Sequence, residues 1–381
     1  MIVTGIFPPD CGGPATYIPI LAEELSKRNH EIMVITLSEE PKLIKDNYPY
    51  KIFRIKRKQF KFARFIKMVF SIIKTGKHCD LIFANGIHFE PVISNMFLRK
   101  PLIHKFVGDY AWEKAQSMKW IHDTFEDFQK TKYSFKIELM KAIRTFAARR
   151  SQKIIVPSIF LKSIVEGWSI QENKISVVYN AAEENIKWQT NITVPLTTKY
   201  KLIYAGRLVR WKNIDKLIEL LIDMPDCGLI IAGDGEEKLR LMQITEKLGI
   251  TNRVYFAGYR NKEELYALMK QSQLFILFSN YEGLPHILLE AMNLGLPIIC
   301  SDAGGTGELM KDRINCVLTE KNDLESLKKT VLQILSDKSF QNKLIEGGKK
   351  TVAQFTVKKM IDETENIFME IVSINKKRNE K

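Results

Sequence analysis

Short apolar segments alternate with longer amphipathic ones along almost the whole chain. The apolar segments are rich in β-branched residues and bounded by Gly, Pro, Asn or Ser, which is typical of buried strands. They occupy residues 31–37, 81–85, 102–108, 153–158, 174–180, 201–207, 228–235, 253–259, 274–279 and 297–304. Between them, segments such as NIDKLIELLIDM repeat apolar residues three and four positions apart, as helices that pack on a sheet do. The alternation predicts an α/β fold, with parallel sheets covered by helices on both faces.

One polar stretch interrupts this alternation, at residues 181–200, where no long apolar period is present. A chain of 381 residues is long enough for two domains. We therefore predict two doubly wound domains, residues 1–180 and 201–355, which this linker joins and which would face each other across a cleft. Residues 356–381 have the pattern of one amphipathic helix, which we expect to return to the first domain. In open parallel sheets ligands bind beyond the carboxyl ends of the strands, so functional residues are expected directly after strands.

The composition limits the classes of protein that the chain can represent. No apolar run reaches the ~18 residues needed to span a bilayer, and the N-terminal MIVTGIFPPD lacks the charged and apolar regions of a signal peptide. The five cysteines are scattered without CxxC spacing, which favours reduced thiols in a cytoplasmic protein over a disulfide framework or a zinc site. The net charge of +14 favours anionic partners, which are nucleic acid, anionic lipid or phosphorylated substrates.

The segment after the first predicted strand is rich in glycine. Gly12 and Gly13 stand directly before a helix that begins near Pro14. Glycines there allow a ligand to approach the backbone, and the free N–H groups of a helix N-terminus attract anions. A tight strand-to-helix turn would use the same residues, so this stretch alone leaves both interpretations open.

Basic residues follow the first strand of the second domain. Arg207 and Lys212 lie five residues apart, at the strand end and before the next helix. Both could reach one diphosphate, Arg as a planar fork and Lys as a point charge. Solvated loop charge is the alternative, and it is the interpretation we favour for Arg210. Arg207 directly follows an apolar strand, which favours a ligand role.

Two further strand ends carry weaker signals. IAGDGEE at 231–237 has the glycines of an anion-binding turn, but its acidic residues favour a capping role, with Asp234 as the cap of the following helix. FAGYR at 256–260 ends the next strand, where Tyr259 or Arg260 could stack on a base; packing at the domain surface is an equal alternative. Gly258 and Tyr259 are kept as candidate ligand-binding residues.

Two glutamates occupy an otherwise apolar segment, NYEGLPHILLEAMNLGLP at residues 280–297. If a helix covers residues 283–294, Glu282 lies in the loop at its start and Glu290 lies about two turns further, ~12 Å along the axis. Carboxylates this far apart cannot serve as the acid and the nucleophile of a retaining hydrolase, which need ~5 Å. They could accept hydrogen bonds from hydroxyls at two ends of one extended ligand. A plain surface helix with a polar stripe is the alternative.

The segment EGLPHILLE resembles the E-x7-E element of retaining, GT-B-fold glycosyltransferases of family 4. Other elements that resemble the family's follow its order: FPPDCGGPATYIPILAEEL, YAGRLVRWKNIDKLI, IAGDGEE, VYFAGY and GLPIICSDAGGTGEL. The likeness covers nearly the whole chain and is tightest in the second half. It implies transfer of a sugar from a nucleotide-diphosphate donor with retention at the anomeric carbon, by front-side attack and without a protein nucleophile.

The resemblance implies a role for each matching residue. Arg207 and Lys212 would bind the donor diphosphate and offset charge on the leaving group. Glu290 would bind the ribose hydroxyls, and Glu282 would hold hydroxyls of the donor sugar. Gly13 would let its loop close on the diphosphate. Backbone contacts to the sugar and the distal phosphate would come from Gly283, Leu284 and Pro285.

The sequence departs from the family pattern in three places. The family often has a His after the first-domain strand near residue 105, but His104 falls inside an apolar strand and is expected in the core. We expect Asp109, with Glu113 nearby, to occupy the exposed loop instead and to position substrate. No D-x-D triad stands at a strand end, so neither a metal nor another cofactor is expected. The chain also begins inside its first strand, which leaves open a short strand or a start further upstream.

Basic charge is concentrated in residues 51–77, which contain ten Lys or Arg and no acidic residue. Within this range Phe62, Phe65, Ile66, Val69, Phe70 and Ile73 follow helix periodicity. One interpretation is a helix packed on the first sheet with a solvated basic face. The other adds contact with an anionic membrane surface, which a lipid-linked acceptor would explain. The residues assigned to that contact are Lys56, Arg57, Lys58, Lys61 and Arg64.

These observations favour a cytoplasmic enzyme, peripheral on the inner face of the cell membrane, that transfers a sugar to a glycan or a polyprenyl-linked saccharide. Nucleic acid is not expected as a partner, because no RNA- or DNA-binding motif is found. A nucleotide-sugar epimerase of the same fold is an alternative, although Asp109 and Glu113 alone do not supply its acid and base. A membrane-bound scaffold with a dead transferase fold is another. The scaffold interpretation is disfavoured because the chain keeps the four residues that the resemblance assigns to the donor, which are Arg207, Lys212, Glu282 and Glu290.

Overall fold

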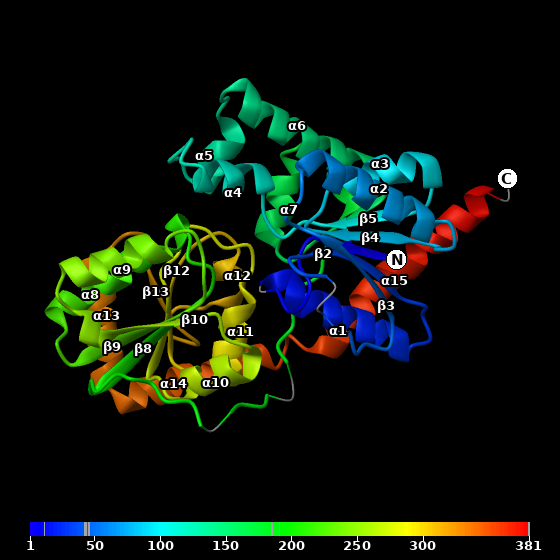
Figure 1. Cartoon of the computed structure of the whole chain (residues 1–381). Coiled ribbons are helices and arrows are strands. Elements are labelled where there is room, and N and C mark those ends of the chain that lie inside the picture. Colours follow the sequence, from blue (N-terminus) through cyan, green and yellow to red (C-terminus); the bar gives the residue numbers. More distant parts are fainter. Residues whose placement is uncertain (11, 42–43, 45, 184–185, 190, 380–381) are drawn as a thin grey trace. The chain divides into compact units, whose positions relative to one another are not determined.

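The computed structural model describes residues 1–10, 12–41, 44, 46–183, 186–189 and 191–379. They form two compact units, each built around its own parallel sheet (Figure 1). The prediction of two doubly wound α/β domains is therefore confirmed. The first unit comprises Met1–Ala115, Glu126–Asn180 and Lys358–Lys381, and the second comprises Gln116–Phe125 and Ala181–Val357.

A seven-stranded parallel sheet forms the centre of the first unit, in the order β3-β2-β1-β4-β5-β6-β7. The order reverses between β1 and β4, and such a switch point is where doubly wound sheets bind ligands. In register, Asn85 at the end of β4 pairs with Thr4 of β1 on one side and with Lys105 of β5 on the other. The strands are β1 (Ile2–Thr4), β2 (Met33–Ser38), β3 (Lys51–Lys56), β4 (Ile82–Asn85), β5 (Leu102–Lys105), β6 (Lys153–Val156) and β7 (Ile175–Val177).

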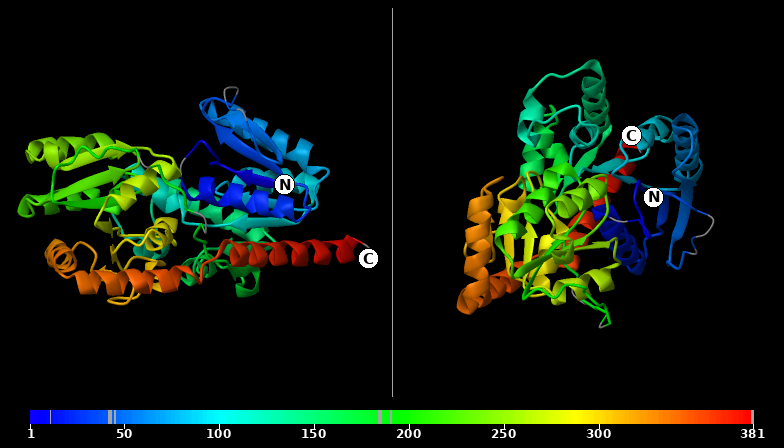
Figure 2. Two further views of the ribbon diagram at one scale, coloured as in Figure 1. Left: turned by 90° about the horizontal axis from the view of Figure 1, so that it is seen from below. Right: turned by 60° about the vertical axis from the view of Figure 1, so that its left-hand side comes forward.

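Helices cover both faces of the first sheet. On one face Ala84 of β4 packs in an apolar cluster with Ile72 of α2 and Ala147 of α6. On the other face the ring of Phe83 lies 5.0 Å from that of Phe368, so the long C-terminal helix α15 is part of this core (Figure 2). The helices are α1 (Gly13–Lys27), α2 (Lys61–Gly76), α3 (Phe89–Leu98), α4 (Tyr110–Ser117), α5 (Phe125–Lys130), α6 (Phe135–Arg150), α7 (Ile159–Glu166) and α15 (Val357–Asn379).

The second unit contains a six-stranded parallel sheet in the order β10-β9-β8-β11-β12-β13. All residues of β9, β11 and β12 are buried, as the apolar runs predicted. Its strands are β8 (Tyr200–Ala205), β9 (Cys227–Ala232), β10 (Val254–Gly258), β11 (Leu274–Leu277), β12 (Ile298–Ser301) and β13 (Val317–Thr319). Its helices are α8 (Ile214–Leu220), α9 (Lys238–Lys247), α10 (Lys262–Lys270), α11 (His286–Asn293), α12 (Thr306–Leu309), α13 (Leu324–Ser336) and α14 (Lys338–Val352).

Two edge strands, β3 and β13, were not predicted. The sequence of β3, KIFRIK, alternates basic and apolar residues, and only one of its residues is fully buried. The three residues of β13 are too few to show a period. Edge strands pair on one side only and are often short or charged, so they lack the continuous apolar run that marks a central strand.

Candidate functional site

The loop after β8 holds the Arg207 backbone and leaves its side chain at the surface. Gly206 opens the loop with a φ of +152°, a conformation that L-residues rarely adopt. The Tyr204 hydroxyl donates a hydrogen bond of 2.9 Å to the Arg207 carbonyl. The exposed Arg207 guanidinium lies 5.7 Å from the centre of the Trp211 ring. The backbone at Arg207 is therefore fixed, while the side chain extends to the protein surface.

The IAGDGEE glycines serve close backbone packing of two loops. A Cβ on Gly233 would overlap the Gly206 carbonyl, and one on Gly235 would overlap the Leu208 backbone. The prediction that Asp234 caps the next helix is wrong. The helix α9 begins at Lys238, and the Asp234 carboxylate instead accepts a hydrogen bond of 2.8 Å from Gly235 N. The tight loop contact leaves Asp234 four positions before the helix.

Lys212 ends a 3₁₀ turn over Arg210–Lys212 and is locked in place by the next residue. Asn213 adopts the left-handed conformation, with φ +50°. Its amide donates hydrogen bonds to Phe278 O at 3.0 Å and to Asn280 Oδ1 at 2.8 Å. These bonds connect the loop after β8 to the loop after β11. As a result the Lys212 ammonium forms an ion pair with the Glu282 carboxylate.

Glu282 lies in a short loop that is held on both sides. Its carbonyl accepts a hydrogen bond of 2.9 Å from Gly305 N, and the preceding Tyr281 ring stacks on Phe125 with centroids 3.8 Å apart. Only 6% of Glu282 is exposed. The structure thus brings together two of the predicted site residues, Lys212 and Glu282, which lie 70 positions apart in the chain.

The helix after Glu282 begins later than predicted. The sequence analysis placed its start at residue 283, but α11 begins at His286 with Pro285 as its N-cap. Gly283, Leu284 and Pro285 are therefore loop residues, and Leu284 is 5% exposed. Pro285 disfavours helical backbone at the preceding Leu284, and Gly283 has a low helix propensity, so both act against an earlier helix start. The assignment of donor contacts to these three residues stays a prediction.

Glu290 lies in the second turn of α11 beside a second carboxylate. Burial raises the pKa of Glu290 to about 7; Lys262 opposes this shift and Glu183 adds to it. Glu183 accepts a hydrogen bond of 3.2 Å from the Tyr266 hydroxyl and pairs with Lys262 at 2.8 Å. The sequence analysis missed Glu183, Lys262 and Tyr266. The one available signal was the Asn-x-x-Glu pattern at 261–264, which forms a capping box and fixes Lys262 in the first turn of α10.

The strand β10 ends at Gly258, and Tyr259 follows directly, three positions before Lys262 of this cluster. Gly258 has a φ of +69° and open space where a Cβ would stand. Half of Tyr259 is exposed. Arg260 instead donates a hydrogen bond of 3.1 Å to the Tyr255 hydroxyl, which favours surface packing for that residue. A base-stacking role for Tyr259 stays a prediction.

The glycine-rich segment of the first unit forms the N-terminus of α1. Gly12 is the N-cap, with φ +130° and ψ 170°, and Gly13 is the first helical residue. The Gly12 carbonyl accepts a hydrogen bond of 2.9 Å from Ala15 N. This backbone conformation explains the glycine at position 12 as part of a tight turn. The binding of a ligand by Gly12 and Gly13 stays a prediction.

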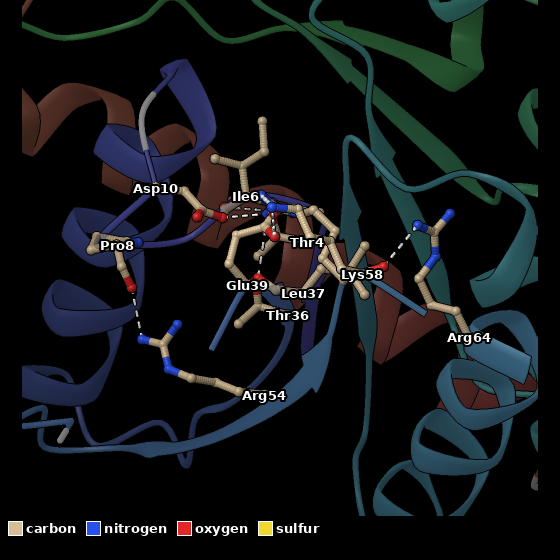
Figure 3. A network of polar contacts seen from close by, with 12 residues as sticks. Thr4, Ile6, Pro8, Asp10, Thr36, Leu37, Glu39, Arg54, Lys58 and Arg64 are labelled. Carbon is tan, nitrogen blue, oxygen red and sulfur yellow. Dashed lines mark hydrogen bonds and ion pairs between the residues drawn. The ribbon is translucent and has the colours of Figure 1, made fainter. Parts of the chain in front are cut away.

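Arg57 and Arg54 hold the loop between β1 and α1. Figure 3 shows Arg54 bonded to Pro8 of this loop. The Arg57 guanidinium donates a hydrogen bond of 2.9 Å to Gly5 O and pairs with the Asp10 carboxylate. Arg54 donates to Pro8 O at 2.7 Å. Arg57 was predicted to contact a membrane, but these bonds direct its side chain into the protein. Its neighbours also lie within 4 Å of acidic groups, because Lys56 is 3.8 Å from Glu40 and Lys58 is 3.3 Å from Glu39.

Asp109 is fully buried, so its predicted place in an exposed loop is wrong. Its carboxylate forms an ion pair with Arg144 of α6 and accepts hydrogen bonds from Gln129 Nε2 at 3.0 Å and Ala111 N at 2.9 Å. Burial raises the pKa of Asp109, and the charge of Arg144 opposes that shift. The carboxylate therefore links the start of α4 to α6.

His104 and Lys105 end β5 on opposite faces of the sheet. His104 is buried, as predicted, and its Nδ1 lies 2.7 Å from Ser151 Oγ; burial lowers its pKa to about 3. The Lys105 ammonium lies 3.3 Å from the centre of the Tyr17 ring. Among the described residues it has no hydrogen-bond acceptor, and burial lowers its pKa well below the ordinary value. The sequence analysis did not single out this buried cation.

Two further observations concern the described residues as a whole. In the described ranges, no cluster of three or more His, Cys, Asp or Glu side chains is placed to hold a metal ion. No helix within the described part of the chain combines the length and the hydropathy needed to cross a bilayer.

Comparisons with known proteins agree with the architecture. Residues 11–185 match the model of Glycosyltransferase Family 4, and residues 186–351 match that of Glycosyl transferases group 1. The fold is similar to that of Alr3699/HepE from Anabaena, solved in complex with UDP-glucose. Its TM-score is 0.74, with 19% identity, over 97% of this chain and 99% of that one.

Two relatives extend the similarity to sequence. The chain is 26% identical to MJ1069, an uncharacterised glycosyltransferase of Methanocaldococcus jannaschii, over 98% of each chain. It is 24% identical to N-acetylgalactosamine-N,N'-diacetylbacillosaminyl-diphospho-undecaprenol 4-alpha-N-acetylgalactosaminyltransferase of Campylobacter jejuni. The latter match covers 74% of this chain and 76% of the relative.

The two parallel-sheet units, together with these matches, define a glycosyltransferase of the GT-B class. Within that class the chain belongs to the family 4 type, as its E-x7-E element implied.

Proposed function

We propose that this enzyme transfers a sugar, with retention at the anomeric carbon, from a nucleotide-diphosphate sugar to a glycan or lipid-linked saccharide. The observation that carries this proposal is the ion pair between Lys212 and Glu282. These are the residues to which the E-x7-E resemblance gives the diphosphate and the donor sugar. Their contact means that one ligand can reach both side chains at once.

The ion pair supplies groups suited to the two ends of a sugar phosphate. The Lys212 ammonium would bind a diphosphate oxygen, and the Glu282 carboxylate would accept hydrogen bonds from sugar hydroxyls. Each ligand group would replace the partner that the side chain has in the free protein, so neither charge would be left unpaired. The exposed Arg207 would add a second cation to the phosphate. Charge that develops on the leaving diphosphate would then meet fixed cations, without a metal ion.

Glu290 has the surroundings expected of a group that binds neighbouring hydroxyls. A carboxylate with a raised pKa ionises near neutral pH and then accepts two hydrogen bonds. We propose the ribose of the donor as its ligand and Tyr259 as the residue that stacks on the base. Lys262, paired with Glu183, would keep the local charge near balance.

We propose Asp109 as a positioning residue. It fixes the first turn of α4 through Ala111 N and anchors that turn to Arg144. Because the loop after β5 ends at this turn, Asp109 would act on substrate through the backbone that it holds. An acceptor attached to a polyprenyl diphosphate is supported by the relative from Campylobacter jejuni, whose name specifies such an acceptor. That acceptor would place the enzyme at the inner face of the cell membrane.

The test is calorimetric titration of the full chain with UDP, GDP and their sugars, followed by product analysis with the tightest-binding donor. We expect one nucleotide series to bind and Arg207→Ala to weaken its binding at least tenfold, about 1.4 kcal/mol. Arg210→Ala is the matched control, since Arg210 lies in the same loop and was assigned solvated charge. An α-linked donor that yields an α-linked product confirms retention.

Two results would contradict the proposal. Failure of every nucleotide to bind would favour a non-enzymatic scaffold. Conversion of the donor to an isomer when no acceptor is present would identify an epimerase. Addition of EDTA tests whether the reaction needs a metal ion. Unchanged turnover is expected, and full loss of turnover would show that a metal ion is needed.

A further inference from the structure

The solvent side of α2 carries large apolar side chains where a surface helix normally carries polar ones. Phe62, Ile66 and Phe70 recur every four residues and are 64%, 44% and 72% exposed. The helix packs inward through Met68 and Ile72 instead. The sequence analysis expected the periodic apolar positions to pack on the sheet, so this part of the prediction is wrong for the outward-facing three.

Helix α3 continues the same apolar surface. It lies beside α2 in Figure 1, and the rings of Phe65 and Phe89 stack between the two helices with centroids 5.8 Å apart. Met96 and Phe97, near the end of α3, are 52% and 73% exposed. We call Phe62, Ile66, Phe70, Met96 and Phe97, together with the exposed lysines of α2, the aromatic-basic face.

The charge on this face is predominantly basic. Glu90, in the first turn of α3, is the one acidic residue of α2 and α3, and residues 57–79 and 91–108 contain none. In the part of the chain that the structure describes, the exposed Lys61, Lys67 and Lys74 pair with no carboxylate. This differs from Lys56, Arg57 and Lys58, which lie near Glu40, Asp10 and Glu39.

We propose that the aromatic-basic face seats the enzyme in the interfacial layer of an anionic lipid bilayer, with the phenylalanines inserted below the head groups. Aromatic side chains favour the bilayer interface, and lysines attract anionic head groups. The centres of protein–protein interfaces are depleted of Lys, whereas here lysines alternate with the apolar residues. The inference deepens the proposed function and rests on it only for the lipid-linked acceptor.

Insertion and electrostatic attraction differ in their response to salt. Attraction between exposed charges is screened at high ionic strength, because the Debye length falls to roughly 3 Å at 1 M salt. Burial of phenylalanine in the interface is not screened. The proposal therefore requires a component of vesicle binding that survives high salt and depends on Phe62 and Phe70.

The experiment is sedimentation of the full chain with phosphatidylcholine vesicles that contain or lack phosphatidylglycerol. We expect binding to the anionic vesicles, and a loss of about tenfold or more in the double variant Phe62→Ser/Phe70→Ser. The matched control is Leu239→Ser in α9 of the second unit, since this leucine is 74% exposed and belongs to neither α2 nor α3. This control should bind as the unchanged protein does.

A second variant separates the two contributions. Lys67→Gln/Lys74→Gln should weaken binding at low salt by about fivefold for each lysine and leave the salt-resistant component in place. All four altered side chains are exposed, so the melting temperature of both double variants should match that of the unchanged protein.

Three outcomes overturn the proposal: no binding of the unchanged protein to anionic vesicles, full retention of binding by the phenylalanine variant, or a change of oligomeric state in that variant without loss of vesicle binding. The last would assign the face to a second copy of the chain. Nucleotide titration of the same variant keeps the tests distinct, because donor binding should be unchanged. If the unchanged protein binds no nucleotide donor, the proposed function is refuted, but the result on vesicle binding is not affected.

Discussion

The two units each contain a buried ion pair, and the pairs differ in how completely the carboxylate is bonded. In the first unit Asp109 accepts from Arg144, from Gln129 Nε2 and from Ala111 N. In the second, Lys212 is the one hydrogen-bond donor to the Glu282 carboxylate in the part of the chain that the structure describes. Both carboxylates are less than 10% exposed.

This difference indicates that the Asp109–Arg144 pair stabilises the fold, whereas the Lys212–Glu282 pair is available to a ligand. A carboxylate has about four acceptor positions, and the protein fills most of those on Asp109. Glu282 keeps acceptor capacity that no group among the described residues uses. Burial alone would have ranked the two residues as equals, whereas the number of bonds to each carboxylate distinguishes them.

The largest expected effect concerns the first-unit pair. Asp109→Ala leaves the Arg144 guanidinium buried without its partner, so the free energy of unfolding should fall by about 3–5 kcal/mol. Denaturant unfolding measures this loss. Asp109→Asn, which keeps an acceptor for Ala111 N, should lose less. A loss below about 1 kcal/mol in Asp109→Ala would place the two pairs in the same category.

The second-unit pair should show the opposite balance. Lys212→Met should lower the transfer rate by about 100-fold or more, since it removes a cation from the leaving group. The free energy of unfolding should fall as well, by about 1.5–3 kcal/mol, because the buried Glu282 carboxylate loses its charged hydrogen-bond donor. Steady-state kinetics on the folded variant, beside denaturant unfolding, test both parts. An unchanged transfer rate in the folded variant would refute a ligand role for Lys212.

Glu290 extends the comparison to a carboxylate that faces another carboxylate. Its pKa is raised from 4.5 to about 7, so the folded state binds the proton more tightly than the unfolded state. This stabilisation is fully present below pH 4.5 and is lost as the pH rises through about 7, by on the order of 3 kcal/mol in all. Unfolding measured across that range should show the decline, and Glu290→Gln should flatten it. An unchanged slope in the variant would assign the decline to other groups.

Lys105 is a buried amine with no carboxylate beside it in the described part of the chain, and its replacement should give the smallest effect. A charged or neutral amine without a hydrogen-bond acceptor costs free energy in the core. Lys105→Met, which has a similar shape, should therefore raise the free energy of unfolding by about 1 kcal/mol. Thermal unfolding measures the change, with Lys162→Met as control, since Lys162 is a partly exposed lysine in a surface ion pair with Glu172. A lower stability would show that the contact with the Tyr17 ring outweighs the burial cost.

The site residues of the second unit could be predicted because each directly follows a strand or lies on a recognisable helix. Arg207 and Lys212 follow β8, and Glu282 follows β11. The motifs that contain these residues can be recognised in the sequence without any knowledge of how the chain packs. The contact between Lys212 and Glu282 could not be predicted, since it depends on the left-handed Asn213 and its bonds to the loop after β11.

Predictions failed where the deciding partner lies far away in the chain. Asp109 looked like an exposed loop residue because Arg144, 35 positions later, gives no local signal. Glu183 was missed because its partner Lys262 lies 79 positions later in the chain. Glu183 itself sits in a polar stretch without any period, so it gave no local signal. For α2 the spacing of apolar residues predicted a helix but not which side packs inward. Met68 and Phe70 have similar hydropathy, and only the position of the sheet decides between them.

The contact of Phe368 with Phe83 has a consequence for synthesis of the chain on the ribosome. Phe83 belongs to a central strand that is translated before the second unit, whereas Phe368 belongs to a helix that is translated after it. Tyr17 also contacts this helix, because its hydroxyl forms a hydrogen bond of 3.4 Å with the Thr364 hydroxyl. The sheet of the first unit therefore keeps an uncovered apolar side throughout translation of the second, and this nascent intermediate is the species that a chaperone would meet.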